Sequence, residues 1–254
     1  MTFSYRLMCV LDASYPSLLD EHRPGRLGSL LGKLLAIGYQ LTGKHRYDNY
    51  RLERVLDMPI LVIPTVANPK LLRTGAFFAK TLASTAVADG ADVLDLGTGS
   101  GICALLAARS ARRVVAVDIN ATAIRCAGIN ASLNRLEKRI DLRHGDLFDP
   151  VAKERFDLVL FNPPFMIGTP KDDRDAAWRS VDTAERFAAG LADHLKPGGT
   201  ALLLLSSFGD AGTTFESQLR AHGYKLSVFA RRRFVNETIT VLRVSPQDVQ
   251  QTVI

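Results

Sequence analysis

The chain alternates between short apolar runs and longer segments that carry apolar residues at helical spacing. The short runs are rich in β-branched and aliphatic residues and lie at 92–97, 113–119, 140–146, 156–161 and 200–207. Runs of this length between turn residues predict strands, and the segments between them predict crossover connections. The pattern therefore predicts an α/β domain built on a mostly parallel sheet.

The clearest predicted helix lies before the last of these runs, where Pro197, Gly198 and Gly199 should end it. A further helix is expected near 211–221, followed by two strands at 225–234 and 237–244 that pair antiparallel. The stripe that predicts the first helix comprises Ala177, Val181, Ala184, Phe187, Ala188, Leu191 and Leu195.

Residues 1–58 follow a different pattern, with leucines at helical spacing between Pro24 and Gly43. We expect a small helical appendage at 1–58 and one large domain at 59–254. The domain should open with a strand at Met58–Pro64 and a helix of about 15 residues after Pro69. The leucine stripe comprises Leu27, Leu30, Leu31, Leu34 and Leu35.

Composition places the chain among ordinary globular proteins, since 47% of its 254 residues are hydrophobic and 23% are charged. No apolar run approaches the roughly 18 residues of a membrane span, and Arg6 and Asp12 interrupt any signal-like core. We expect a cytoplasmic protein without membrane contact. Cys9, Cys103 and Cys126 are widely spaced and odd in number, which predicts neither disulfides nor a metal site.

The net charge of +6 favours an acidic partner such as nucleic acid, a ribosome or an anionic small molecule. Cations gather among aromatic residues at Gly43–Arg51 and in the triplet Arg231, Arg232 and Arg233. These groups could contact RNA. A solvated helix face and a hairpin tip explain them at least as well.

Candidate chemistry begins where the first predicted strand of the series ends. Asp95 ends that strand, and a loop with Gly97, Gly99 and Gly101 leads into a helix rich in alanine and leucine. Glycines let the backbone approach a ligand closely, so a nucleotide-type cofactor is the natural occupant, although the loop alone could be a tight turn. The dinucleotide fingerprint requires a glycine where this chain has Ile102, and Asp95 would repel phosphates, which disfavours hydride chemistry.

Two more acids end the next two strands. Asp118 follows Asp95 by 23 residues, and Asp146 ends the third strand. A carboxylate at the second position can accept hydrogen bonds from both hydroxyls of a ribose. Each acid alone could cap the following helix, but acids at successive strand ends beside a glycine loop indicate a cofactor site.

The fourth strand runs directly into Asn162, Pro163, Pro164 and Phe165. Proline lacks the N–H that a sheet ladder needs, so the two prolines end the strand and hold Asn162 at its carboxyl edge. The Asn162 side-chain oxygen and the Pro163 carbonyl can accept two N–H groups, and the Phe165 ring can stack on a planar substrate. The alternative is a proline-rich turn that merely ends a strand.

In order, DLGTGSG, VDIN, GDLF and FNPPF resemble the motifs of class I S-adenosylmethionine-dependent methyltransferases, from about residue 59 onward. The resemblance implies a Rossmann-like fold with a seven-stranded, mostly parallel sheet and an antiparallel last strand, and S-adenosylmethionine as cofactor. By position it implies that Asp95 holds the amino group of the cofactor's methionine, Asp118 its ribose and Asp146 its adenine. The implied catalytic residues are Asn162, Pro163, Pro164 and Phe165, and the implied cofactor-binding residues are Asp95, Gly97, Thr98, Gly99, Gly101, Asp118, Ile119, Asp146, Leu147 and Asn162.

The Asn-Pro-Pro-aromatic form is similar to that of enzymes that methylate planar nitrogens, namely HemK-type glutamine methyltransferases and small-domain RNA N-methyltransferases. Such a nitrogen shares its lone pair with a π system, so it must be positioned and partly rehybridised before it attacks a methyl group. A glutamine amide of a protein is the favoured substrate. Alternatives are guanine N2 or adenine N6 in RNA or DNA, a small-molecule amine or amide, and a catalytically silent RNA-binding relative.

Two features depart from the pattern of the glutamine enzymes. Phe165 stands where those enzymes more usually have tyrosine, whereas phenylalanine is more usual in the RNA guanine enzymes. Residues 1–58 match the accessory domain of neither family.

Overall fold

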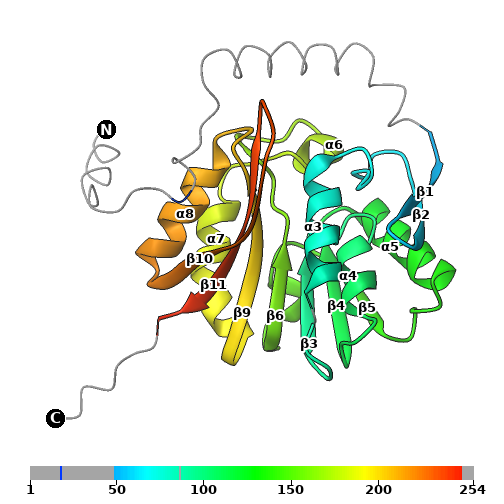
Figure 1. The fold of residues 1–254 in the computed structure, drawn as a ribbon, viewed down its shortest axis with the longest axis horizontal. Helices are drawn as coiled ribbons and strands as arrows, with labels where there is room; N and C mark the ends of the chain where they lie inside the picture. Colours follow the sequence, from blue (N-terminus) through cyan, green and yellow to red (C-terminus); the bar gives the residue numbers. More distant parts are fainter. Residues whose placement is uncertain (1–17, 19–48, 86, 248–254) are drawn as a thin grey trace.

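A computed structural model describes Leu18, residues 49–85 and residues 87–247 of the chain. Its centre is a seven-stranded sheet in the order β10-β11-β9-β6-β3-β4-β5 (Figure 1). β11 runs antiparallel to both of its neighbours, and the other pairings in the sheet are parallel, which confirms the predicted fold class. The strands are β3 (Asp92–Leu96), β4 (Arg113–Asp118), β5 (Ile140–His144), β6 (Phe156–Phe161), β9 (Leu195–Ser206), β10 (Tyr224–Arg233) and β11 (Thr238–Pro246).

Helices cover both faces of the sheet. Alternate residues of β3 point to opposite faces, so Val93 joins one core cluster and Leu94 the other. Phe78 of α3 packs in the first cluster, and Phe187 of α7 packs in the second. The helices are α3 (Arg73–Ser84), α4 (Ile102–Ala107), α5 (Ala121–Leu133), α6 (Asp173–Ala176), α7 (Thr183–Leu191) and α8 (Ala211–Ala221), with short 3-10 turns at η2 (Asp149–Val151) and η3 (Ala192–His194). Within the described residues no helix is both long and apolar enough to cross a membrane.

The strand order determines where a ligand can bind. The chain proceeds outward from β3 through β4 to β5 and then returns to place β6 on the other side of β3. In open parallel sheets such a reversal leaves a crevice outside the carboxyl ends of the two central strands. Asp95 lies on β3 and Asn162 directly follows β6, so both flank this crevice.

The segment before α3 forms a hairpin of β1 (Arg51–Val55) and β2 (Met58–Val62). The predicted strand at Met58–Pro64 is confirmed as β2, and the predicted helix after Pro69 is α3, with 12 residues. The helical prediction for residues 51–55 is wrong. Their side chains alternate between more and less exposed positions, and their backbone pairs with β2. The leucine stripe lies outside the described residues, and the boundary at residue 58 stays a prediction.

The helix predicted from the stripe before β9 is shorter than expected. Only its central part forms α7, whereas Val181 is 63% exposed and Leu195 begins β9. The backbone is extended just before α7, because β8 (Arg179–Ser180) pairs with β7 (Met166–Ile167) beyond the end of β6. The strand β9 also begins before Thr200, since Leu195 pairs with Phe156 of β6.

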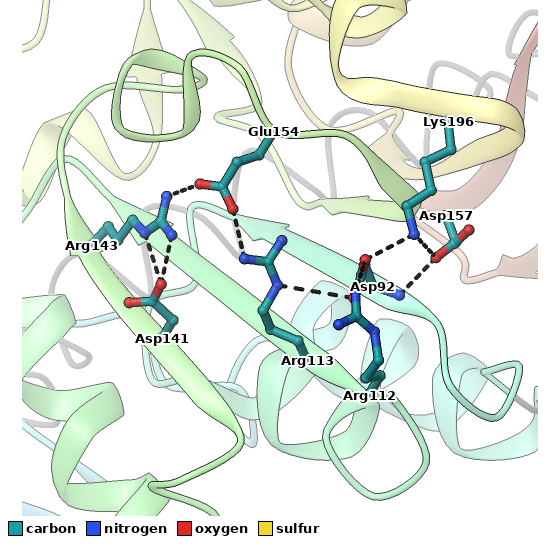
Figure 2. Close-up of polar contacts among 8 residues, drawn as sticks. All are labelled: Asp92, Arg112, Arg113, Asp141, Arg143, Glu154, Asp157 and Lys196. Carbon is teal, nitrogen blue, oxygen red and sulfur yellow. Dashed lines mark hydrogen bonds and ion pairs between the residues drawn. The ribbon is translucent and has the colours of Figure 1, made fainter.

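The amino ends of the strands carry a network of ion pairs, shown in Figure 2. Lys196 of β9 bridges the carboxylates of Asp92 on β3 and Asp157 on β6, at 2.8 and 2.7 Å. Arg113 of β4 contacts Glu154 at 2.7 Å, and Glu154 in turn pairs with Arg143, whose guanidinium also contacts Asp141. The contacts of Lys196 join β9, β3 and β6 at the edge opposite the crevice, which leaves the carboxyl edge for chemistry.

Candidate active site

A cavity of about 240 Å³ lies at the carboxyl ends of β3, β4 and β6. It brings together residues that the sequence places far apart in the chain and that we predicted as a site. Those in its wall are Gly97, Gly99, Asp118, Ile119, Asp146, Leu147, Asn162, Pro163, Pro164 and Phe165. The predicted residues Asp95, Thr98 and Gly101 do not line it.

The glycine loop needs its glycines for two different reasons. Gly97, Gly99 and Gly101 have φ angles of 61°, 56° and 84°, in the left-handed region that favours glycine. Gly97 and Gly99 reach the cavity wall. At Gly101 a Cβ would lie 3.0 Å from the Cβ of Ala127 on α5, so this glycine lets the loop pack against that helix.

Asp95 supports the loop from behind. Its Oδ2 accepts hydrogen bonds from Thr98 Oγ1 at 2.6 Å and from the backbone N–H of Ala104 at 3.1 Å. Burial raises the pKa of Asp95 to about 7, and these two hydrogen bonds only partly oppose that rise. Asp95 therefore fastens the glycine loop to α4, and its direct contact with a cofactor amino group stays a prediction.

Asp118 lies in the cavity wall at the end of β4. Its two oxygens accept the backbone N–H groups of Gly99 and Asn120, each at 2.9 Å. Burial raises the pKa of this carboxyl, although both hydrogen bonds act in the opposite direction. Each oxygen retains a second acceptor lone pair, so a fixed carboxylate can still accept vicinal hydroxyls. The neighbouring Ile119 is 56% exposed and offers an apolar surface to a ring.

Asp146 follows β5 and is held by a residue that the sequence reasoning did not identify. Arg186 of α7 donates from Nη1 to Asp146 Oδ2 at 2.6 Å, and this hydrogen bond raises the pKa of Arg186. Both side chains lie in the cavity wall. The next residue, Leu147, has a φ of 44°, an uncommon angle for a residue with a side chain. The turn after β5 is thus held in a defined conformation that presents Asp146 and Leu147.

Asn162 carries an acceptor that the protein leaves unused. Its side-chain Oδ1 is buried and has no hydrogen-bond partner among the described residues. A buried polar atom without a partner costs about 1–3 kcal/mol, so such atoms are rare and call for an explanation. A substrate N–H group that enters the cavity would supply the missing partner.

The turn between β9 and α8 holds the Asn-Pro-Pro-Phe tip in place. The backbone N–H of Ala211 donates to the carbonyl of Phe165 at 3.1 Å, and that of Ile167 donates to Asp210 Oδ1 at 2.8 Å. Gly209 has a φ of 106°, and a Cβ there would lie 2.2 Å from the Phe165 carbonyl oxygen. The tip therefore rests directly on backbone, which limits its movement.

The aromatic wall of the cavity differs from the expectation. Phe165 is only 8% exposed, and its ring packs against Trp178 at 6.2 Å between centroids with a tilt of 58°. Trp178 lies just before β8, is half-buried and also lines the cavity. The sole tryptophan of the chain, close after the proline motif, was the available sequence signal for this residue. Stacking of Phe165 itself on a substrate stays a prediction.

The chemistry of these groups fits S-adenosylmethionine. The glycine backbone and the Asp118 carboxylate suit a hydroxylated, cationic ligand without phosphates, since a carboxylate beside the loop would repel phosphate. The unpartnered Asn162 oxygen suits an N–H donor placed beside that ligand. In the part of the chain that the structure describes, no three His, Cys, Asp or Glu side chains are grouped as metal ligands would be.

Comparisons with known proteins agree with this chemistry. The family model described as "Methyltransferase small domain" matches residues 69–231. A release factor glutamine methyltransferase from Gloeobacter violaceus is 31% identical over 207 residues, which cover 74% of this chain and 68% of that enzyme. Ribosomal RNA small subunit methyltransferase C from Alcanivorax borkumensis is 35% identical over 112 residues, or 44% of this chain and 31% of that protein.

Among solved structures, the chain is similar in fold to a T. thermophilus 16S rRNA N2 G1207 methyltransferase in complex with AdoMet and guanosine. The TM-score is 0.58 at 22% identity, and the match covers 78% of this chain and 50% of that one.

Proposed function

The chain belongs to the methyltransferase small domain family, and we propose that this S-adenosylmethionine-dependent enzyme methylates a planar nitrogen, specifically a glutamine amide of a protein. The observation that carries the proposal is the buried, unpartnered Oδ1 of Asn162 in the cavity wall. A primary amide offers two N–H donors on one nitrogen. Asn162 Oδ1 would accept one of them and the Pro163 carbonyl the other.

These two acceptors would do more than bind the amide. When bound, the cofactor supplies an electrophilic methyl group, and the substrate nitrogen gains a bond to carbon as the carbon–sulfur bond breaks. The nitrogen becomes more acidic as that bond forms, so hydrogen bonds from its N–H groups strengthen in the transition state. Because the prolines and the Gly209 turn fix the acceptors in advance, little reorganisation is needed during the reaction. The nitrogen can then release its proton to water.

The cofactor-binding residues are also part of the proposal. Asp118 would accept the ribose hydroxyls, Asp146 the adenine amine, and Gly97 and Gly99 would let the backbone approach the methionine part. Asp95 would act through the loop that it holds. The predicted cytoplasmic location belongs to this proposal as well.

A glutamine substrate is favoured because a glutamine methyltransferase aligns with nearly three quarters of the chain. Methylation of guanine N2 in RNA is the second candidate, and Phe165 in the motif together with the net charge of +6 favours it.

Methyl-labelled S-adenosylmethionine and separated cellular protein and RNA distinguish the two candidates. The enzyme is incubated with each fraction, and the products are digested enzymatically to amino acids or nucleosides and identified by mass spectrometry. We expect label in N5-methylglutamine, and far less of it in the same incubation time when Asn162→Ala replaces the wild type. Label in N2-methylguanosine would select the second candidate, and label in neither fraction would contradict methylation of a macromolecule.

A further inference from the structure

A second hollow, of about 380 Å³, adjoins the active-site cavity across the first turn of α3. Leu72 and Thr74 face the cavity, whereas Leu71 and Arg73 line the second hollow. Its other walls come from the β1–β2 turn and from the tip of the β10–β11 hairpin, and Figure 1 shows α3 between these two hairpins. We call it the basic groove, after the cations that line it: Arg54, Lys70, Arg73, Lys80 and Arg232.

Only part of this positive charge is compensated. Lys70 pairs with Glu53 at 3.1 Å, and Arg73 lies 3.8 Å from Glu237. The other three cations of the groove are exposed and form no ion pair with the acids of the described residues. The groove therefore carries an excess of positive charge within reach of the cavity.

The structure also separates the three arginines that the sequence presented as one group. Arg231 turns toward Thr240 and the backbone carbonyl of Leu18. Arg232 points into the groove, with its guanidinium 5.0 Å from the centre of the Phe234 ring. Arg233 is exposed and does not line the groove. Because neighbouring residues of a strand face opposite sides, the triplet is not a single patch.

The floor of the groove is apolar. Val55 is buried, and Leu71 and Phe77 are half-buried. A nucleic-acid backbone has no apolar side chains to place on such a floor, whereas a protein segment has them. Stacking of a base on Phe234 is also hindered, because the guanidinium groups of Arg73 and Arg232 lie 4.7 and 5.0 Å from the ring centre.

We propose that the basic groove binds an acidic segment of the protein substrate, with an apolar side chain on its floor and carboxylates at its cationic rim. This inference rests on the proposed function, since it assigns a docking surface to a protein that is methylated in the neighbouring cavity. The first turn of α3 separates the two sites, so one extended chain can occupy both.

Binding of labelled probes to the protein tests the basic groove and requires no methyl transfer. Fluorescence anisotropy compares three labelled probes of equal net charge: a peptide of alternating Glu and Leu, the same peptide with Ser in place of Leu, and a single-stranded oligoribonucleotide. The test variant is Lys80→Glu with Arg232→Glu. The matched control is Lys138→Glu with Arg233→Glu, which makes the same charge change at exposed positions outside both hollows. Thermal unfolding of both variants shows whether they fold.

We expect the Glu-Leu peptide to bind best, and its affinity to fall by about tenfold or more in the groove variant but by less than about threefold in the control. Equal losses in the two double variants, or tighter binding of the oligoribonucleotide with loss in the groove variant, would overturn the proposal. The Asn162→Ala enzyme should bind the peptide like the wild type. A failure of the glutamine assignment would appear only in the product analysis, so the two failures are distinguishable.

Discussion

The side-chain amide of Asn130 pairs with the backbone of Leu61 in the way that a neighbouring strand would. Asn130 Oδ1 accepts the N–H of Leu61, and Asn130 Nδ2 donates to the carbonyl of the same residue, both at 2.7 Å. Nδ2 also donates to the carbonyl of Ser100 in the glycine loop, at 2.8 Å. Leu61 lies on β2, which leads to Thr65 and Val66 in the cavity wall. One buried amide on α5 therefore joins two walls of the active site.

Removal of this amide should destabilise the protein and loosen the cavity. Asn130→Ala leaves the Leu61 N–H and the Ser100 carbonyl without these partners, whereas the Leu61 carbonyl keeps a hydrogen bond from Cys126 Sγ at 3.2 Å. We expect a loss of about 2–4 kcal/mol in the free energy of unfolding. Urea unfolding measures it. Asn134→Ala is the matched control, since Asn134 Nδ2 donates to Pro59 and Asn130 carbonyls from a half-buried position, and it should cost about 1 kcal/mol. Equal losses of unfolding free energy in Asn130→Ala and Asn134→Ala would contradict the role of Asn130 in joining the two walls.

Cofactor binding should depend on Asp118. Asp118→Ala removes an acceptor of charge-assisted hydrogen bonds and frees the Gly99 loop, so affinity for S-adenosylmethionine should fall by about 2–4 kcal/mol. Calorimetry measures this directly. The control Asp149→Ala, at an exposed acid near the cavity but outside its wall, should bind like the wild type. Unchanged affinity of Asp118→Ala for S-adenosylmethionine would contradict the assignment of this cavity as the cofactor site.

The buried carboxyl of Asp95 should make stability depend on pH. Its pKa is raised to about 7 from 3.8, so the folded protein binds the proton more tightly than the unfolded chain. This contribution to stability is fully present below about pH 4 and is lost as the pH rises toward the folded pKa. Asp95→Asn keeps an acceptor without a charge. Its free energy of unfolding relative to the wild type should therefore rise between about pH 4 and about pH 7. A constant difference would show that Asp95 is ionised throughout.

The turn behind the proline tip should control turnover rather than cofactor affinity. Gly209→Ala places a Cβ 2.2 Å from the Phe165 carbonyl oxygen at a φ of 106°, so the turn or the tip must move. Misplacement of about 1 Å can cost about 100-fold in rate, and we expect a loss of that order in kcat. Gly223→Ala, at a φ of 77° with open space around its Cβ, is the control for backbone strain alone. Similar kcat values in both variants would contradict the positioning role.

The parallel strands could be predicted from sequence because each is a short apolar run bounded by turn residues. β1 could not, since its sequence, RLERV, shows its strand character only through pairing with β2. The apolar stripe at residues 177–195 predicted a longer helix than α7, because the pairing of β7 with β8 extends the backbone before the helix begins.

In the candidate site, too, local sequence patterns predict some features, whereas others depend on long-range contacts. The acids and the proline motif occur at strand ends, where sequence position implies spatial position. Arg186 and Asn130 act on partners 40 and 69 residues away, and no local pattern connects such pairs.

The central claim is that Asn162 Oδ1 accepts an N–H of the nitrogen that is methylated. The most direct test measures, in the same variants, the single-turnover rate of methyl transfer and the affinity for the cofactor. Asn162→Ala should lower the rate of methyl transfer by about 100-fold or more while cofactor affinity changes far less, because the hydrogen bond strengthens in the transition state. Asn162→Asp retains the acceptor and the shape, so it should retain measurable activity. Wild-type rates in both variants on the identified substrate would contradict the account.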